Sequence, residues 1–306
     1  MIAIFRKCTF AAAATILFGF PSALRAQDTG SPAPIAPPQP GAPPAKVEQA
    51  KEQAKLAQMT PLVPSPTEPT RPAFQLYAEA DLPILGVGLV FVSARLTRVE
   101  KAFCAPLCDP SDLNALDRST AGWWSPAWST ATDIGLYSIA GGAFATLVAD
   151  EGLLNALNDA VVITESATAG MAVSSLLTLA TNRPRPFLYG EKAPLSDRNS
   201  PNGSFSYSSS HATVSFAIAT STFMALRRLH PRSPAAFWAL GVGGSIATFV
   251  AVGRVMAGMH FISDAVGGAV VGSSMGVLVP SLHGSPVKIV PVVAGDERGI
   301  GIAGRF

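Results

Sequence analysis

The sequence contains few charged residues. Asp, Glu, Lys and Arg make up 14% of its 306 residues, and the formal net charge is +2. Because neither sign is in excess, the basic field that nucleic-acid binding requires is missing, and we expect no nucleic acid as a partner. So low a charged fraction is typical of a membrane protein or of a compact helical protein that buries much of its surface.

Cysteine is scarce as well, with three residues in the chain. Cys8 lies in an N-terminal apolar segment, whereas Cys104 and Cys108 form the pair CAPLC. No histidine is near this pair in the sequence, so a zinc site would lack ligands. We expect a local disulfide between Cys104 and Cys108, because the N-terminus predicts export to an oxidising compartment. Two unpaired thiols are the alternative.

The N-terminus has the form of a targeting segment. Residues 1–26 combine a basic start, an apolar stretch and small residues before Ala26, which predicts a signal peptide. An uncleaved anchor is the alternative, because Leu24 is not ideal three residues before the cut. Residues 27–72 are rich in Pro and Ala, and we interpret them as a linker with one short helix. We therefore expect the folded domain at 73–284.

Apolar segments alternate with loops through this domain. They span 82–97, 133–149, 153–181, 211–229, 234–256 and 261–279. Glycine and alanine are frequent in them, and small residues permit close approach of helices. We predict an all-α bundle of about six core helices. Residues 285–306 instead alternate β-branched and small residues around Gly295 and Asp296, which predicts a short C-terminal β-hairpin packed on the bundle.

Residues with phosphate-binding chemistry gather at the ends of four predicted helices. They are Arg183 and Arg185 after the third segment, Ser209, Ser210 and His211 at the start of the fourth, Arg254 near the end of the fifth, and His260 and Asp264 at the start of the sixth. In an up-and-down bundle these four ends lie at the same end of the molecule. We therefore expect Arg185, His211, Arg254 and His260 to converge.

The chemistry of these residues points to a phosphate group. Guanidinium groups match phosphate oxygens bidentately, and a helix N-terminus attracts anions. Two histidines can divide the roles of nucleophile and acid, and Asp264 can fix the tautomer of one of them. Taken singly, an Arg-Pro pair is usually structural and a serine run is usually an N-cap. The remaining histidines, His230 and His283, are expected to be solvated surface residues.

Together these motifs resemble the type 2 phosphatidic acid phosphatase and vanadium haloperoxidase superfamily, over about residues 130–280. The family pattern is Lys-x6-Arg-Pro, then Pro-Ser-Gly-His, then Ser-Arg-x5-His-x3-Asp. The matching residues are Arg185 and Pro186 in the first motif, Ser209 and His211 in the second, and Arg254, His260 and Asp264 in the third. The family fold is a helical bundle, in agreement with the interpretation above.

The sequence departs from the family pattern at four positions. Thr178 replaces the family lysine, Ser208 the proline, Ser210 the glycine and Gly253 the serine. The missing lysine removes one charge from the phosphate pocket, and one lost transition-state contact typically costs about 10²–10³ in rate. Arg183, two residues before Arg185, is a candidate for part of that charge.

The resemblance implies a metal-independent phosphatase without a cofactor, which hydrolyses a phosphate ester or a lipid (di)phosphate through a phosphohistidine. In this scheme His260 attacks phosphorus, Asp264 orients it and His211 protonates the leaving oxygen. The phosphoryl group would be held by Arg185, Arg254, Ser209 and the amides near Ser210. A vanadate-dependent haloperoxidase is one alternative. A non-catalytic envelope protein that keeps the fold is the other, and Thr178 is its best support.

The position relative to the membrane stays open between two alternatives. Segments 234–256 and 261–279 are long enough to span a bilayer. The basic loop 227–232 would be cytoplasmic by the positive-inside rule, which places the site at the opposite, outer end. Six spans would then put residue 73 inside, whereas a cleaved signal peptide leaves it outside. We favour a periplasmic bundle, soluble or peripheral, over an integral inner-membrane protein with a site that faces the periplasm.

Overall fold

The computed structural model describes residues 71–97, 99–283, 288–294 and 297–303. The fold is helical over 71–283, which confirms the all-α prediction for this part. Its long helices are α2 (Ala78–Leu96), α4 (Pro126–Glu151), α5 (Leu153–Thr181), α7 (Ser210–Leu229), α8 (Ala235–Met256) and α9 (Ile262–Leu282). The expected signal peptide, and the expected linker as far as residue 70, lie outside the described residues.

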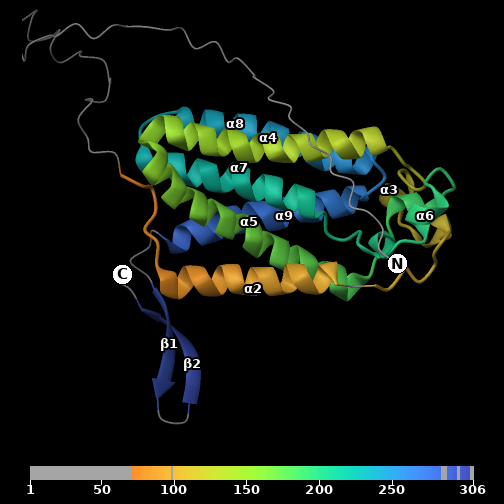
Figure 1. Cartoon of the computed structure of the whole chain (residues 1–306), viewed down its shortest axis with the longest axis horizontal. Coiled ribbons are helices and arrows are strands. Elements are labelled where there is room, and N and C mark those ends of the chain that lie inside the picture. Colours follow the sequence, from red (N-terminus) through yellow and green to blue (C-terminus); the bar gives the residue numbers. More distant parts are fainter. Residues whose placement is uncertain (1–70, 98, 284–287, 295–296, 304–306) are drawn as a thin grey trace, which may run out of the picture. The chain divides into compact units, whose positions relative to one another are not determined.

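The connections between these helices gather mainly at one end of the bundle, which we call the loop end (Figure 1). It comprises residues 97–125, 182–209 and 257–261, and the opposite end is called the far end. The loop end contains five short elements: η1 (Pro110–Asp112), α3 (Ala115–Arg118), η2 (Pro186–Tyr189), α6 (Leu195–Arg198) and η3 (Pro201–Ser204).

Helix α7 lies at the centre of the bundle and packs against α4, α5, α8 and α9. Small side chains let its neighbours approach closely. On α9 the facing residues are Gly268, Gly272 and Gly276, one turn apart. A Cβ atom at Gly272 would lie 2.1 Å from the carbonyl oxygen of Thr213, so these glycines allow the backbones of α7 and α9 to touch.

Helix α2 packs along α5, and both helices run toward the loop end (Figure 1). They pack closely at Gly88, where a Cβ atom would lie 2.3 Å from the Thr168 side chain. The segment before α2 is held to α5 by Asp159, whose carboxylate accepts hydrogen bonds from the backbone of Ala73 (2.8 Å) and Phe74 (3.1 Å). These contacts fix the position of α2 beside α5.

Two sharp changes of direction turn the chain at the loop end. Helix α5 ends at Asn182, which adopts the left-handed conformation with φ 47°, as asparagine does more readily than most residues. After α8, Gly258 has φ 73°, and a Cβ atom there would lie 1.8 Å from the carbonyl oxygen of Trp123. Gly258 therefore allows the chain to reach His260 and start α9 within a few residues.

Two antiparallel strands follow the bundle. β1 (Lys288–Ala294) pairs with β2 (Glu297–Ala303), and Val290 lies opposite Gly301. The turn residues 295–296 and the flanking residues 284–287 and 304–306 lie outside the described residues. The expected packing of a hairpin on the bundle therefore stays a prediction.

The flanks of the bundle expose many apolar side chains. Examples are Tyr137 on α4 (76% exposed), Trp238 on α8 (74%) and Val270 on α9 (61%). In the described part of the chain, four segments are long and apolar enough to cross a membrane: 126–151, 153–189, 235–256 and 262–282. The helices therefore fit the integral-membrane alternative better than the soluble bundle that we favoured from sequence.

Candidate active site

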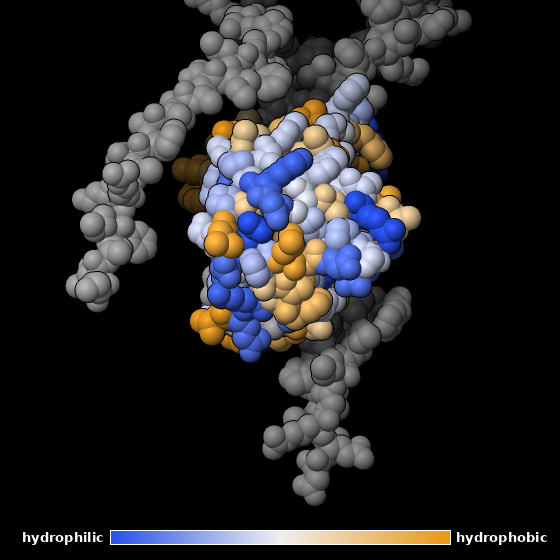
Figure 2. Space-filling model, turned by 90° about the vertical axis from the view of Figure 1, so that its right-hand side faces the viewer, coloured by the Kyte–Doolittle hydropathy of each residue, from blue (hydrophilic) through white to orange (hydrophobic). Residues whose placement is uncertain are grey.

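The loop end brings the four predicted residues together. The charges of Arg185, Arg254 and His211 all act on His260. Arg185 lies in the connection between α5 and α7, His211 in the first turn of α7 and Arg254 in the last turn of α8. Figure 2 looks onto this end of the molecule, where most of the described surface is hydrophilic or intermediate in hydropathy, with a few apolar patches. These polar residues therefore lie beneath the largely polar surface of the loop end, whereas the flanks of the bundle are apolar.

His260 is buried, with 1% of its surface exposed. Its Nδ1 lies 2.7 Å from the carbonyl oxygen of Ser206, and because a carbonyl only accepts, Nδ1 carries the ring proton. Nε2 then presents a lone pair, and no residue in the described part of the chain hydrogen-bonds to it. Burial lowers the pKa of His260 well below its usual value, and the charges of Arg185 and Arg254 lower it further.

Asp264 forms no hydrogen bond with His260 in the described part of the chain, so the orienting role that we expect for it would be indirect. Its carboxylate instead accepts hydrogen bonds from Ser206 Oγ (2.5 Å) and from the backbone N–H of Phe261 (2.8 Å). Ser206 in turn holds Nδ1 of His260 through its carbonyl. The aspartate therefore positions the histidine through the Ser206 segment and through the first turn of α9.

Arg183 does not fit the phosphate-binding role that we considered for it. Its two terminal nitrogens pair with Asp264 (2.5 Å) and Asp117 (2.8 Å), and its guanidinium lies 4.5 Å from the centre of the Phe261 ring. Asp117 also accepts hydrogen bonds from Ser263. Arg183 therefore joins α3, the α5–α7 connection and α9, with its charge already compensated by two carboxylates.

Arg185 and Arg254 are the buried cations of the cluster, with 4% and 5% of their surfaces exposed. The terminal nitrogens of Arg185 contact Met259 Sδ at 3.0 Å, and those of Arg254 contact Ser129 Oγ at 3.1 Å. The Nε atoms of both arginines are buried without a hydrogen-bond partner. Two buried guanidinium groups with spare donors have the chemistry to bind an anion.

His211 is paired with an aspartate that the sequence motifs did not indicate. Its Nε2 lies 2.9 Å from Oδ1 of Asp133, on the second turn of α4, and the same oxygen is 3.8 Å from Arg254. Asp133 is the only charged residue between Pro126 and Val148, in an otherwise apolar helix. That isolated charge was the available signal for a functional residue.

Ser209 is the N-cap of α7 and Ser210 is its first residue, and the hydroxyls of both form hydrogen bonds within the protein. Ser209 is buried, and its Oγ accepts a long hydrogen bond from the backbone of Ala212 (3.5 Å), as an N-cap does. The Oγ of Ser210 accepts a hydrogen bond from Arg95 of α2. The N-terminus of α7 therefore faces the cluster, while one of its hydroxyls binds a cation that the sequence motifs missed.

Residues 159–286 match the model of the PAP2 superfamily. Over this segment the chain is similar to members of the PAP2 superfamily. The match contains every motif residue from Arg185 to Asp264, whereas Arg95 and Asp133 lie before it. This similarity supports a phosphatase-type hydrolase.

A crystal structure of a transmembrane PAP2-type phosphatidylglycerolphosphate phosphatase from Bacillus subtilis is similar to this chain. The two are 21% identical with a TM-score of 0.40, over 65% of this chain and 93% of the other. A comparison with curated proteins gives no match.

The cysteine pair lies at the loop end, before the segment that matches the PAP2 superfamily. Cys104 and Cys108 are joined by a disulfide, with their Cα atoms 5.0 Å apart. Cys108 packs with Phe187 and Leu188, and its backbone N–H donates to the carbonyl oxygen of Leu188 at 2.9 Å. The bridged loop therefore covers the connection that carries Arg185.

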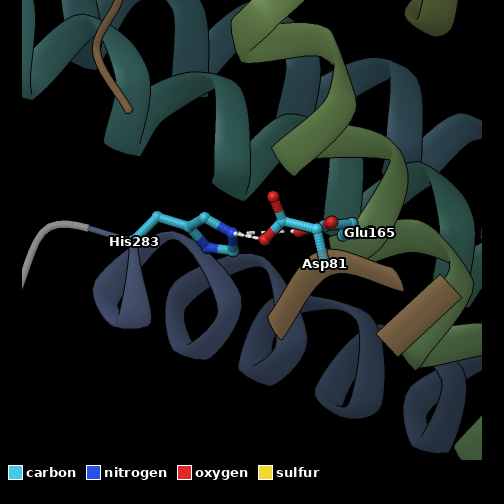
Figure 3. Close-up of side chains that lie close together, drawn as sticks. All are labelled: Asp81, Glu165 and His283. Atoms are coloured by element: carbon cyan, nitrogen blue, oxygen red, sulfur yellow. Dashed lines mark hydrogen bonds and ion pairs between the residues drawn. The ribbon is translucent and has the colours of Figure 1, made fainter. Parts of the chain in front are cut away.

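A second polar cluster lies toward the far end and was not expected (Figure 3). His283 is buried, so the prediction of a solvated residue is wrong; its Nε2 lies 2.9 Å from Asp81 and 3.1 Å from Glu165. The three side chains have metal-ligand chemistry. However, Nδ1 faces the carbonyl oxygen of Val279 at 2.9 Å. Since both nitrogens face acceptors, a protonated imidazole satisfies the cluster as an ion triad.

Proposed function

We propose that the chain is a phosphatase that forms a phosphohistidine at His260 and needs no metal ion. The observation that carries this proposal is the arrangement of His260, whose Nδ1 is held by Ser206 while Nε2 keeps its lone pair beside two buried arginines. A fixed, neutral imidazole is a nucleophile, and guanidinium groups supply the charge that stabilises a phosphoryl transition state.

The reaction takes two steps. The Nε2 lone pair of His260 attacks phosphorus, so that the P–N bond forms as the ester P–O bond breaks. His211 gives its proton to the leaving oxygen. Water then attacks the phosphohistidine and gives a proton to His211, which releases inorganic phosphate and restores both side chains. Arg185, Arg254 and the amides at the start of α7 hold the phosphoryl oxygens throughout.

Asp133 determines which nitrogen of His211 acts as the acid. Because Nε2 is bonded to Asp133, the proton for the leaving group comes from Nδ1, which has no hydrogen bond within the described residues. Burial and the charge of Arg254 lower the pKa of His211 to about 4, and the Asp133 carboxylate partly offsets this because it stabilises the protonated ring. The proposed roles of His211 and Asp133 are therefore linked.

A lipid phosphate or lipid diphosphate is the substrate class that we propose. The exposed apolar flanks of α4, α8 and α9 lie beside the polar loop end, so a lipid in the bilayer can present its phosphate at the site while its chains stay in hydrocarbon. The basic loop 227–232 lies at the far end, which supports a loop end that faces the periplasm.

The test is phosphate release by the purified full chain in detergent or vesicles, with a chelator present. Lipid phosphates and small phosphomonoesters are compared as substrates. His260→Ala is the inactivating variant, and His230→Ala is the matched control, because His230 lies at the far end and pairs with Asp150. We expect release by the wild type and by the control, and none by His260→Ala.

Three outcomes would contradict this proposal. Equal release by the wild type and His260→Ala would show that the site does not carry the activity, and absence of release from all substrates would favour a non-catalytic envelope protein. Bromide oxidation that requires added vanadate would favour the haloperoxidase alternative, because vanadate occupies the same kind of anion pocket.

A further inference from the structure

We propose that Arg95 of α2 supplies the positive charge that the family pattern places at position 178, and that it binds the phosphoryl group of the substrate. This inference rests on the proposed phosphatase function and names a binding residue that lies before the segment matched by the family model. It also accounts for two departures from the family motifs, Thr178 and Ser210.

Thr178 itself contributes no charge to the pocket. It is fully buried on α5, and its hydroxyl donates to the carbonyl oxygen of Ser174 at 2.8 Å, one turn earlier. Ser174 lies on the same face of α5 and is in hydrogen-bond range of Ser210 (3.4 Å). The face of α5 that would carry a lysine is thus joined to the start of α7 through hydroxyl groups.

The guanidinium of Arg95 reaches this same place from the neighbouring helix. Helices α2 and α5 touch at Gly88, and Arg95 follows about two turns later on the same side of α2. Its NH1 donates to Ser210 Oγ, the hydroxyl that Ser174 approaches. A lysine at position 178, one turn beyond Ser174, would approach the start of α7 from α5. Arg95 reaches the same place from α2.

The charge of Arg95 is not compensated within the described part of the chain. Arg95 contacts the Phe205 ring at 5.3 Å and the Ser210 hydroxyl, but it forms no ion pair with a described residue. Its charge repels those of Arg185 and Arg254. Asp133 offsets part of the charge of Arg254 at 3.8 Å, but Arg95 and Arg185 form no ion pair with a described residue. The excess positive charge is relieved by a dianion, which is the charge state of a phosphate monoester.

Arg183 is the natural comparison, because it was the sequence-based candidate for this charge. Two carboxylates already bind its terminal nitrogens. Arg95 has a neutral partner instead, so its attraction for a phosphate is not cancelled. Ser210, which replaces the family glycine, provides the oxygen that holds Arg95 at the pocket.

The experiment compares variants at position 95 in the full-length protein. Arg95→Ala should lower kcat/KM for phosphate release by about 10²-fold, as loss of one transition-state contact does. Arg95→Lys should retain more activity than Arg95→Gln if charge matters, whereas the two would be equal if only the hydrogen bond to Ser210 mattered. Arg232→Ala, an exposed arginine in the far-end loop, is the matched control and should behave as the wild type.

A rescue variant tests the substitution for lysine directly. Thr178→Lys in the Arg95→Ala background should restore at least about a tenth of the lost activity, because it returns a charge to the family position. Added guanidinium ions should partly restore Arg95→Ala as well. Rates of Arg95→Ala and wild type within about twofold, or equal rates of Arg95→Lys and Arg95→Gln, would overturn the inference.

Binding of orthovanadate separates this inference from the proposed function. Protection of the resting protein against thermal unfolding by orthovanadate needs no turnover, and the same scan shows whether each variant is folded. Arg95→Ala should require about tenfold more orthovanadate than the wild type. If the wild type neither binds orthovanadate nor releases phosphate, the proposed function itself is wrong. If it binds, and folded Arg95→Ala binds equally well, Arg95 is not a phosphate ligand.

Discussion

Two histidines make the same contact at opposite ends of the bundle. His211 and His230 each place Nε2 2.9 Å or less from an aspartate, Asp133 at the loop end and Asp150 at the far end. Only the first pair adjoins the buried arginines. A histidine–aspartate pair therefore does not by itself indicate a catalytic role, and the neighbouring arginines distinguish His211 from His230.

The substitution Asp133→Asn tests this difference. It keeps the size of the side chain but removes the charge that supports protonated His211, so kcat should fall by about 10²-fold, the range of general acid catalysis. Asp150→Asn should leave kcat unchanged, because His230 has no role at the site. A fall in both variants, or in neither, would contradict the role of Asp133.

The pH profile tests the protonation state of His260. Its folded-state pKa is lowered by burial and by the adjacent arginines, so the neutral nucleophile persists well below pH 6.5. Activity should be lost only when the pH falls through that lowered pKa. The acid limb of kcat/KM, which reports the free enzyme, should therefore lie well below the usual histidine range. An acid limb near pH 6.5 would show that His260 is not buried as described.

At the scale of helices, the packing of α7 on α9 holds the proposed catalytic histidines at a fixed separation. Gly268 faces the carbonyl oxygen of Ser209, and Gly272 faces that of Thr213. These contacts fix the start of α7, with His211, against the start of α9, which follows His260. A spacer between the two helices would therefore alter the distance between the two histidines.

The substitution Gly272→Ala should destabilise the fold. The added Cβ would lie 2.1 Å from backbone, which cannot yield as a side chain can, so we expect a loss of about 1–3 kcal/mol. Gly241→Ala on α8 is the matched control, because no atom lies within 4 Å of its added Cβ. Thermal unfolding in detergent should show a lower Tm for the first variant only.

Helix positions were predictable because apolar runs end at proline, glycine or charge. The segment 153–181 coincides with α5, and 211–229 differs from α7 by one residue. Helix α4 begins at Pro126, seven residues before the predicted start at residue 133. The prediction missed these residues because Trp128, Ser129 and Thr132, which contact α8, interrupt the apolar pattern. Polar residues that serve the site thus concealed the first turns of the helix.

At the scale of the molecule, the site combines residues from within and outside the family segment. The motif residues could be found from spacing, because helix ends in an antiparallel bundle meet. Arg95 and Asp117 could not, because each comes from a separate helix and has no motif around it, and Asp133 was marked only by its isolated charge in α4. Their partners became visible only when the fold placed α2, α3 and α4 beside the loop end.

The exposed apolar flanks predict that the protein is an integral membrane protein. Washing membranes with alkaline carbonate should leave the full chain in the pellet, because the four apolar helices would otherwise expose their side chains to water. A peripheral control protein should be released in the same wash. Recovery of this chain in the supernatant would instead support the periplasmic bundle.

The central claim is that His260 is the nucleophile, and its most direct test is to trap the phosphohistidine. The full chain is mixed with a phosphorylated substrate, quenched at alkaline pH, where phosphohistidine survives, and digested for peptide mass spectrometry. We expect a phosphoryl group on the peptide that contains His260 and none in His260→Ala. The amount of labelled peptide should be larger in Asp133→Asn if hydrolysis of the intermediate slows. A phosphoryl group on another residue, or rapid turnover with no labelled peptide, would contradict the claim.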